Sequence, residues 1–326
     1  KYQLYKWPGH GLGTGVNSYQ YVEGAYMKAD EYDALINDPY DFAMRTFLPR
    51  VLGLTQPLQT STPFSYLVAS PLSFIGPMAT PEYRQMLLTL AEAGKEMAAW
   101  QQVVEECHKA AIASGMPFLG GGYAMAPFDA IADGLRGTKG VVLDMYRQPD
   151  KLLAAIDRIT PMIIKDAIAM ADAAKGIIVG FALHKGDDTF MSQAQFEKFY
   201  WPSLKKVILA LIDEGIIPWL FAEGRFSTRL ETIKDIPKGW ATWMFDQTDM
   251  VKAKQSLKGT ACIAGNIPAS LNCFGSAADV REHCHQLIET CAPGGGYILT
   301  GGGNLTEAKP ENFRVMMAAA KEFGVY

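Results

Sequence analysis

Two short segments hold the side chains best suited to chemistry. His-Lys-Gly-Asp-Asp at 184–188 follows an apolar run, and Glu223 comes at the end of a second apolar run. Histidine, lysine and carboxylates this close together can supply metal ligands or move protons. A buried carboxylate needs a partner, so Glu223 faces an arginine, a metal ion or a substrate group. The alternatives are a solvated, helix-capping turn at 184–188 and a structural ion pair of Glu223 with Arg225 or Arg229.

Both segments lie just after predicted strands in a regular alternation of strands and helices. Six apolar runs from residue 116 onward are predicted to be strands, namely 116–121, 176–183, 216–221, 240–245, 260–265 and 296–301. Nearly continuous apolar strands that alternate with helices predict a parallel sheet covered by helices. We therefore expect an α/β protein whose functional groups follow the strands.

The polar residues after these strands form the predicted site. The set is Tyr123, His184, Lys185, Asp187, Asp188, Glu223, Arg225, Asp246, Asn266 and Asn304, the last preceded by Gly301–Gly303. This glycine run predicts either an anion site made of backbone N–H groups or close backbone packing. His283 and His285 are not expected to share a metal ion, because residues two apart on a helix point about 200° apart. We expect Cys284, which lies between them, to pack in the core.

The first 115 residues decide which α/β fold is expected. They are irregular apart from helices predicted at 31–38, stopped by Pro39, and at 81–114, stopped by Gly115. A closed (β/α)8 TIM barrel needs eight strands, so either this part hides two strands or the chain begins after the first units. A doubly wound open sheet is the alternative, although no Gly-x-Gly-x-x-Gly turn follows a strand. One barrel domain over residues 1–326 is expected.

Composition and charge limit the binding partners and the cellular location that we expect. The chain has 326 residues and a formal net charge of −4, which does not favour nucleic acid or an anionic membrane surface. We find no apolar run of about 18 residues that would predict a transmembrane helix, and no signal-peptide pattern. Five cysteines without a Cys-x-x-Cys pair indicate free thiols in a reducing, cytoplasmic setting.

Longer motifs in residues 115–326 resemble the uroporphyrinogen decarboxylase superfamily. The resemblance rests on DDTFMSQAQFEKFYWPSLKKVI, IPWLF with the following Glu-Gly, TACIAGNIPASL, GGGYILTGGGN and AKPEN, in this order. The superfamily includes uroporphyrinogen decarboxylase itself and the corrinoid-dependent methyltransferases of methanogens and anaerobic demethylating bacteria. It implies a (β/α)8 barrel in which two strands normally precede the unit that starts near residue 116.

The sequence departs from both groups at their functional positions. The zinc methyltransferases carry His-x-Cys-Gly where this chain has Phe-Ala-Glu-Gly at 221–224, and a second cysteine where it has Gly303. The arginine-rich segment of uroporphyrinogen decarboxylase is not recognisable, and Gly303-Asn304 replaces the region of its late histidine. The thiolate zinc site of the relatives is therefore absent.

The resemblance implies a methyltransferase of the O-demethylase type. Its cofactor would be a corrinoid (cobalamin) on a corrinoid-binding partner protein, and its methyl donor a small, possibly methoxyaromatic, compound. Glu223, His184 and Asp187 are the predicted catalytic residues. Zinc with harder ligands stays open, with Glu223, His184 and Asp188 (or Asp187) as candidates. The predicted substrate-binding residues are Tyr123, Arg225, Asp246, Asn266 and Asn304. The alternatives are a tetrapyrrole decarboxylase and a non-catalytic barrel subunit of a corrinoid-dependent system.

Overall fold

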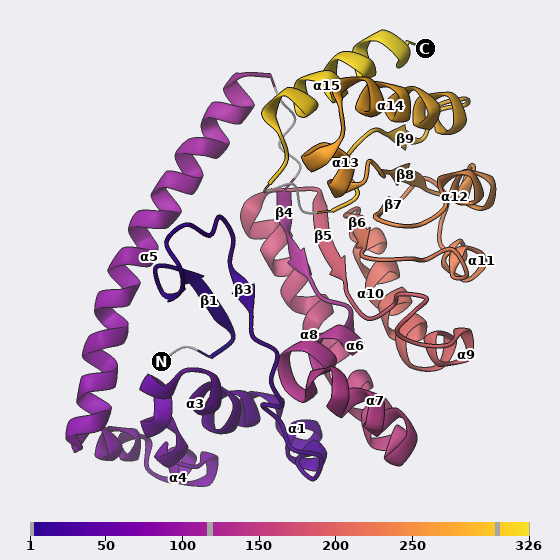
Figure 1. Ribbon diagram of the computed structural model, residues 1–326. Helices are drawn as coiled ribbons and strands as arrows, with labels where there is room; N and C mark the ends of the chain where they lie inside the picture. The colour runs from indigo at the N-terminus through magenta and orange to yellow at the C-terminus, as the bar shows by residue number, and fades with distance from the viewer. Residues whose placement is uncertain (1–2, 116–119, 304–306, 326) are drawn as a thin grey trace. The chain divides into compact units, whose positions relative to one another are not determined.

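The chain divides into two compact units. The first comprises Lys1–Leu119 and Asp133–Ala155, and the second comprises Gly120–Ala132 and Ile156–Tyr326. The computed structural model (Figure 1) describes residues 3–115, 120–303 and 307–325. The expectation of one domain over residues 1–326 stays a prediction.

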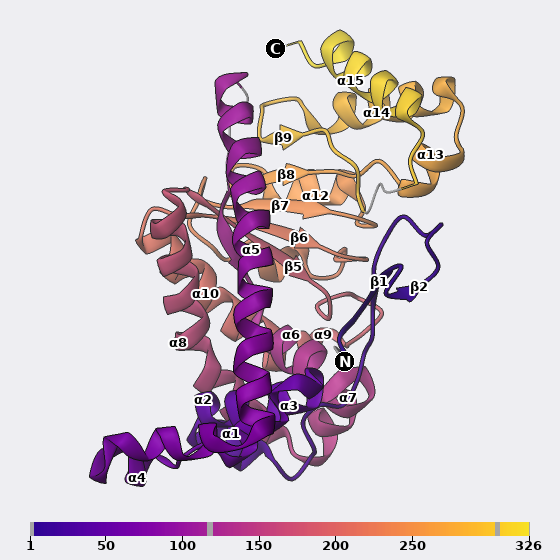
Figure 2. The same ribbon diagram turned by 90° about the vertical axis from the view of Figure 1, so that its left-hand side faces the viewer.

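A six-stranded parallel sheet forms the centre of the second unit. Its strands follow one another in chain order, and Figure 2 shows β5 to β9 one above another. The bounds are β4 Gly120–Ala124, β5 Ile178–Leu183, β6 Ile217–Ala222, β7 Thr242–Phe245, β8 Cys262–Ala264 and β9 Tyr297–Ile298. The α/β class with a parallel sheet is confirmed. A doubly wound sheet reverses its strand order at a switch point, so the consecutive order excludes that alternative.

One face of the strands is fully buried, and helices pack against the sheet. Along β5 and β6 every second residue is buried and the residues between them are half-buried. Helices α10 (Trp201–Asp213) and α12 (Met250–Leu257) pack against β6 and β8. This arrangement is what nearly continuous apolar strands predict for a parallel sheet.

The helices of the second unit begin where the sequence indicates. Ser192 and Ser276 each form the two reciprocal hydrogen bonds of a capping box, with Gln195 and Asp279. Pro310 lies in the first turn of the last helix, a position that tolerates proline. The remaining bounds are α6 Pro127–Ile131, α8 Pro149–Ala174 (which crosses the boundary between the units), α9 Gln193–Gln195, a π-helical turn Phe196–Tyr200, α11 Leu230–Ile233, α13 Ala269–Phe274, α14 Ala277–Cys291 and α15 Pro310–Phe323.

The alternation of strands and helices predicts a helix after β6, and only the short helix α11 forms there. The backbone N–H groups of Phe226 and Thr228 donate to the side chains of Thr248 and Asp188. These side-chain acceptors replace the carbonyl oxygens that a helix would offer, so the chain stays irregular until Leu230.

The first unit contains a small sheet of its own. Strands β1 (Tyr5–Pro8), β2 (Gly11–Leu12) and β3 (Gln20–Tyr21) pair in the order β2-β1-β3. Among residues 3–115 no strand pairs with the parallel sheet, so the two extra strands sought there are not found in the described part of the chain.

Helices make up most of the first unit. Its centre is a buried network in which Arg136 and Tyr32 donate hydrogen bonds to the carboxylate of Asp144. Pro39 ends the first helix and Gly115 follows the long one, as the sequence predicts. The helices are α1 Tyr32–Asn37, α2 Pro39–Asp41, α3 Leu48–Val51, α4 Phe64–Ala69, α5 Pro81–Ala113 and α7 Gly137–Arg147, with π-helical turns Phe42–Phe47 and Ala132–Arg136 and 3-10 turns Gly53–Thr60 and Pro71–Ala79.

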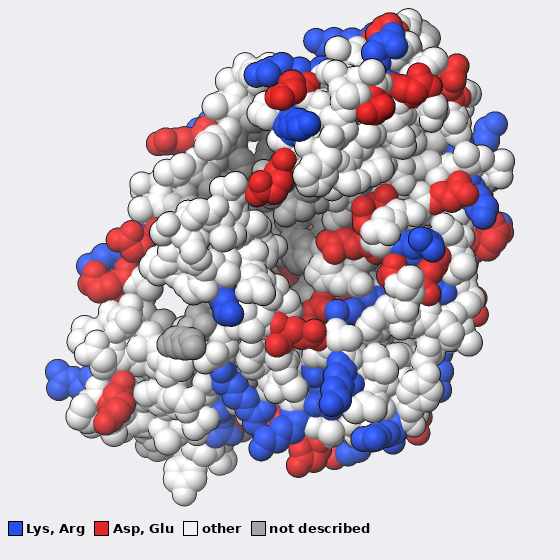
Figure 3. Space-filling view, viewed as in Figure 1, with Lys and Arg blue, Asp and Glu red and all other residues white. Residues whose placement is uncertain are grey.

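Three general properties complete the description. None of the helices in the described ranges is both long enough and apolar enough to cross a bilayer. All five cysteines are free thiols, and Cys284 and Cys291 are buried as the apolar stripe of α14 predicts. On the face seen in Figure 3, acidic and basic side chains are interspersed.

Candidate active site

A polar pocket opens at the carboxyl ends of β5 and β6. Its volume is about 390 Å³, and it lies where parallel α/β enzymes place their chemistry. The lining residues come from the loops after β5, β6 and β7, and they are His184, Lys185, Asp187, Thr189, Phe190, Glu223, Gly224, Arg225 and Gln247. Both chemical segments of the sequence therefore meet in one pocket.

His184 and Glu223 face each other because of the strand register. Leu183 and Ala222 are register partners on β5 and β6, and each is followed by one member of the pair. The Nε2 atom of His184 lies 3.7 Å from Oε1 of Glu223, and the two side chains are 35% and 43% exposed. The distance is long for a hydrogen bond but suits an ion pair when the imidazole is protonated. Both side chains are partly exposed in the pocket, so each can contact a bound ligand.

Hydrogen bonds from neighbouring loops hold the turn that presents Glu223. The N–H of Arg225 donates to Oδ2 of Asp187 at 2.5 Å, and the N–H of Gly224 donates to Oδ2 of Asp246 at 3.2 Å. The N–H of Gln247 donates to the carbonyl of Gly224. The turn after β6 is therefore tied to the loops after both neighbouring strands.

Gly224 is the residue that this turn requires. Its φ is +78°, and a Cβ atom there would lie 2.2 Å from Oδ2 of Asp187. Such a close approach leaves no room for a side chain, and the left-handed backbone favours glycine independently. Asp187 can reach the N–H of Arg225 because Gly224 lacks a side chain.

Replacing Gly224 with alanine is expected to destabilise the fold more than the same change at Gly215. Both glycines have positive φ, but a Cβ at Gly215 would meet nothing within 4 Å. Gly215→Ala should cost only the backbone strain of about 1–2 kcal/mol, whereas Gly224→Ala must also displace the Asp187 carboxylate. Denaturant unfolding of both variants measures the difference, and equal losses would contradict this role of Gly224.

The carboxylate of Asp187 stabilises the turns that form the pocket. Burial opposes its ionisation, but hydrogen bonds from the N–H of Arg225 and from Thr189 outweigh burial and lower the pKa of Asp187 below its ordinary value. A carboxylate held ionised in this way is a poor proton donor. The structure thus favours a positioning role for Asp187 over the predicted catalytic one.

This lowered pKa predicts a pH dependence of stability. The pKa of Asp187 in the folded chain lies below its ordinary 3.8, so its contribution is complete above that pH. The contribution is lost as the pH falls through the lower, folded value. Asp187→Asn should therefore flatten the acid side of the curve of unfolding free energy against pH. The same change at exposed Asp213 should leave the curve unaltered. Identical curves for wild type and Asp187→Asn would mean that the ionised Asp187 does not stabilise the fold.

Asp188 has a structural partner in Arg229. Its carboxylate accepts hydrogen bonds from the N–H and hydroxyl of Thr228, and it lies 3.4 Å from Nε of Arg229. The Arg229 side chain is 1% exposed and also donates to the carbonyls of Gly186 and Met191. Arg229 therefore stabilises the loop after β5, and its ion pair is with Asp188 rather than with Glu223.

The candidate zinc ligands do not come together. Glu223 and His184 are neighbours, but the oxygens of Asp188 are bonded to Thr228 and Arg229. Within the described ranges, no three His, Cys, Asp or Glu side chains are grouped to hold a metal ion. A structural zinc site takes four ligands and a catalytic one takes three from the protein, so the donors present do not fit the predicted set.

The other predicted substrate-binding residues divide between pocket and scaffold. Arg225 is exposed and lines the pocket, and Tyr123 is 46% exposed at the end of β4 but is not part of the lining. Asp246 ties the Gly224 turn, and the Asn266 amide donates to the carbonyls of Asp246 and Thr248. Asn304 lies outside the described residues.

The glycine run after β9 packs closely against the loop after β7. A Cβ atom at Gly302 would lie 2.9 Å from the carbonyl oxygen of Asp246, and the N–H of Gly302 donates to Ile267. This contact explains Gly302 by close backbone packing. Of the two expectations for Gly301–Gly303, it supports close packing rather than an anion site.

Asp129 is the residue of this region that the sequence analysis missed. It is fully buried, and it accepts hydrogen bonds from the N–H groups of His184 at 3.0 Å and Lys185 at 3.1 Å. The buried hydroxyl of Tyr200 donates to the same carboxylate at 2.7 Å. Asp129 therefore fixes the start of the loop that carries His184. The available signal was an acidic residue directly after Pro-Phe in an apolar helix.

Comparisons with known proteins agree with this architecture. The family profile described as "Uroporphyrinogen decarboxylase (URO-D)" matches residues 111–323. A methyltransferase from Methanosarcina mazei is structurally similar, with a TM-score of 0.55 and 18% sequence identity. The similarity covers 64% of this chain and 60% of that chain, so the chain spans less than two thirds of that protein. No curated protein matches the sequence significantly. With its consecutive parallel strands and a family match over most of its length, the chain belongs to the uroporphyrinogen decarboxylase family, whose fold is the TIM barrel.

Proposed function

We propose that the protein transfers a methyl group from a small methylated compound, such as a methoxyaromatic, to a corrinoid carried by a partner protein. The observation that carries the proposal is the Glu223–His184 pair, which lies at the strand ends of a barrel of this family. The structural likeness to a methyltransferase supports it. The predicted reducing cytoplasm suits a corrinoid, which must be reduced to accept a methyl group.

The reaction needs an acid at the oxygen of the methyl ether. The bond between carbon and oxygen breaks with its electron pair on oxygen, and that oxygen is a poor leaving group unless it takes a proton. Glu223 would supply this proton, and His184 would restore it from solvent. The reduced corrinoid of the partner is the second substrate and provides the electron pair of the new bond to carbon. The reaction then balances in atoms and charge. The ether, a proton and the reduced corrinoid would give the alcohol and the methylated corrinoid protein.

The remaining pocket residues would orient the methyl donor. Arg225 is exposed in the lining and offers a guanidinium for a carboxylate or phenolate group. The ammonium of Lys185 lies 5.6 Å from the centre of the Phe190 ring, so the pocket also has an aromatic wall. A methoxylated benzoate combines the groups that such a pocket recognises. We assign no step to zinc, because the candidate donors are not assembled.

An anaerobic assay with chemically reduced cobalamin tests the proposal. The protein is mixed with a methoxybenzoate, and the absorbance of reduced cobalamin is followed together with the release of the hydroxybenzoate. Stoichiometric, protein-dependent loss of both substrates supports methyl transfer. Decarboxylation of uroporphyrinogen, measured in parallel, would favour the tetrapyrrole decarboxylase instead. Inactivity in both assays, also with corrinoid proteins supplied, would favour the non-catalytic barrel subunit.

A further inference from the structure

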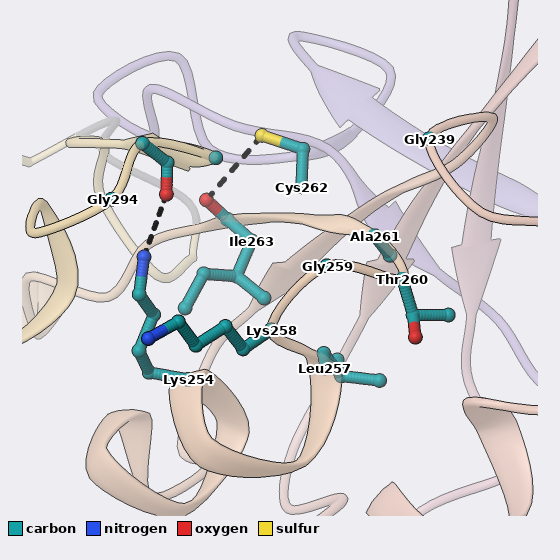
Figure 4. A pocket seen from close by; sticks show the side chains of 12 residues that line it. Gly239, Lys254, Leu257, Lys258, Gly259, Thr260, Ala261, Cys262, Ile263 and Gly294 are labelled. Carbon is teal, nitrogen blue, oxygen red and sulfur yellow. Dashed lines mark hydrogen bonds between the residues drawn. The ribbon is translucent and has the colours of Figure 1, made fainter.

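A second pocket lies at the other end of the parallel strands. Its volume is about 280 Å³, and it is formed by the end of α12, the start of β8 and the glycine loop before β9 (Figure 4). Cys262 is the first residue of β8, whereas the Glu223 pocket follows the last residue of β6. The two pockets therefore lie at opposite edges of the sheet. This edge of a barrel usually serves stability, so a hollow lined by two lysines is not explained by catalysis.

Two lysines give this pocket a positive character. Lys254 and Lys258 are four residues apart at the end of α12, and both line the pocket. Figure 4 shows their side chains reaching along one wall toward the segment that contains Gly294. Among the described residues, no aspartate or glutamate lines this pocket.

The opposite wall is a run of glycines with left-handed backbone. Gly294, Gly295 and Gly296 all have φ between +68° and +79°, and a Cβ atom at any of them would meet nothing within 4 Å. The left-handed backbone favours glycine here, and the wall borders open space. The ammonium of Lys254 donates to the carbonyl of Gly295 at 2.6 Å, which leaves two of its three donors for another group. Thr260 also lines the pocket, but Figure 4 shows its hydroxyl at the far end from the two ammonium groups.

We propose that this pocket binds a phosphate dianion, either free phosphate or the phosphate of a small monoester. Two ammonium groups beside an uncrowded glycine wall match the charge and donor requirements of that group. The partial negative charge at the C-terminus of α12 favours a lysine there. It does not explain why two lysines line the same hollow. The site is separate from the proposed methyl transfer, so failure of either proposal leaves the other standing.

Isothermal titration of the full chain with inorganic phosphate, and separately with glycerol 3-phosphate, tests the site. Saturable binding of one phosphate per chain is expected for at least one of them, and the tighter ligand identifies the source. Lys258→Ala should weaken binding about ten-fold or more, and Lys258→Arg should retain most of it. The matched control is Lys252→Ala, which changes an exposed lysine of the same helix outside the pocket and should bind as wild type does.

A thiol in the wall provides a local reporter. Cys262 lines the pocket, whereas Cys107 is exposed in the other unit of the chain. Saturating phosphate should slow alkylation of Cys262, measured by mass spectrometry of its peptide, and leave Cys107 unaffected. The proposal is overturned if neither anion binds saturably, or if Lys258→Ala binds as tightly as Lys252→Ala.

Discussion

Replacing Glu223 with glutamine is expected to lower the rate of methyl transfer by about a hundred-fold or more, with the fold intact. Glutamine keeps the size of the side chain beside His184 but cannot give up a proton at the ether oxygen. The effect should fall on kcat, because the proton matters only as the bond breaks. Steady-state rates of the cobalamin assay measure it, and the unfolding midpoint shows whether the variant is folded.

The control for this change is Glu214→Gln, which makes the same substitution at an exposed position after α10. It should be as active as the wild type. If Glu223→Gln were also as active, Glu223 would have no part in the mechanism. Glu223→Asp is a second variant of interest, since it keeps the acid and moves it back by one methylene.

Replacing Arg229 with methionine is expected to lower the free energy of unfolding by about 3–5 kcal/mol. The change leaves the nearly buried carboxylate of Asp188 without its cation, and it removes hydrogen bonds to the loop after β5. Arg229 also packs over the ring of Phe196 at 4.8 Å, a contact that methionine keeps in part. The loss is therefore electrostatic for the most part. Denaturant unfolding measures it.

Arg225→Met is the matched control, because Arg225 is exposed and its side chain lines the pocket. Its effect on unfolding should stay within about 0.5 kcal/mol, while binding of an anionic methyl donor weakens. Equal destabilisation by the two changes would mean that Arg229 does not stabilise this loop.

The sequence predicted the frame of the site because strand ends can be recognised locally. Apolar runs mark the strands, and polar residues directly after them must lie at one edge of a parallel sheet. This logic found His184 and Glu223, and the register of Leu183 with Ala222 explains their contact. It could not distinguish the roles of Asp187, Asp188 and Asp246, because each role depends on which backbone N–H group the carboxylate reaches.

Asp129 and Lys258 show a second limit of sequence patterns. Asp129 lies 55 residues before His184 along the chain, so no local spacing indicates that it accepts the N–H of that residue. The lysines of α12 look like ordinary surface residues until the loop Gly294–Gly296 is placed against them. In both cases the partner comes from a distant segment.

The sequence by itself determined the α/β class, the six parallel strands and the edge of the sheet where His184 and Glu223 meet. These features follow from apolar periodicity and from the fixed direction of parallel strands, which are local properties. The tertiary structure alone decided that Asp187, Asp188 and Asp246 support the turns, and that a second pocket, lined by two lysines, exists. Such outcomes depend on hydrogen bonds and burial between segments far apart in the chain, and carboxylates of the same type acquire different roles only once those neighbours are in place.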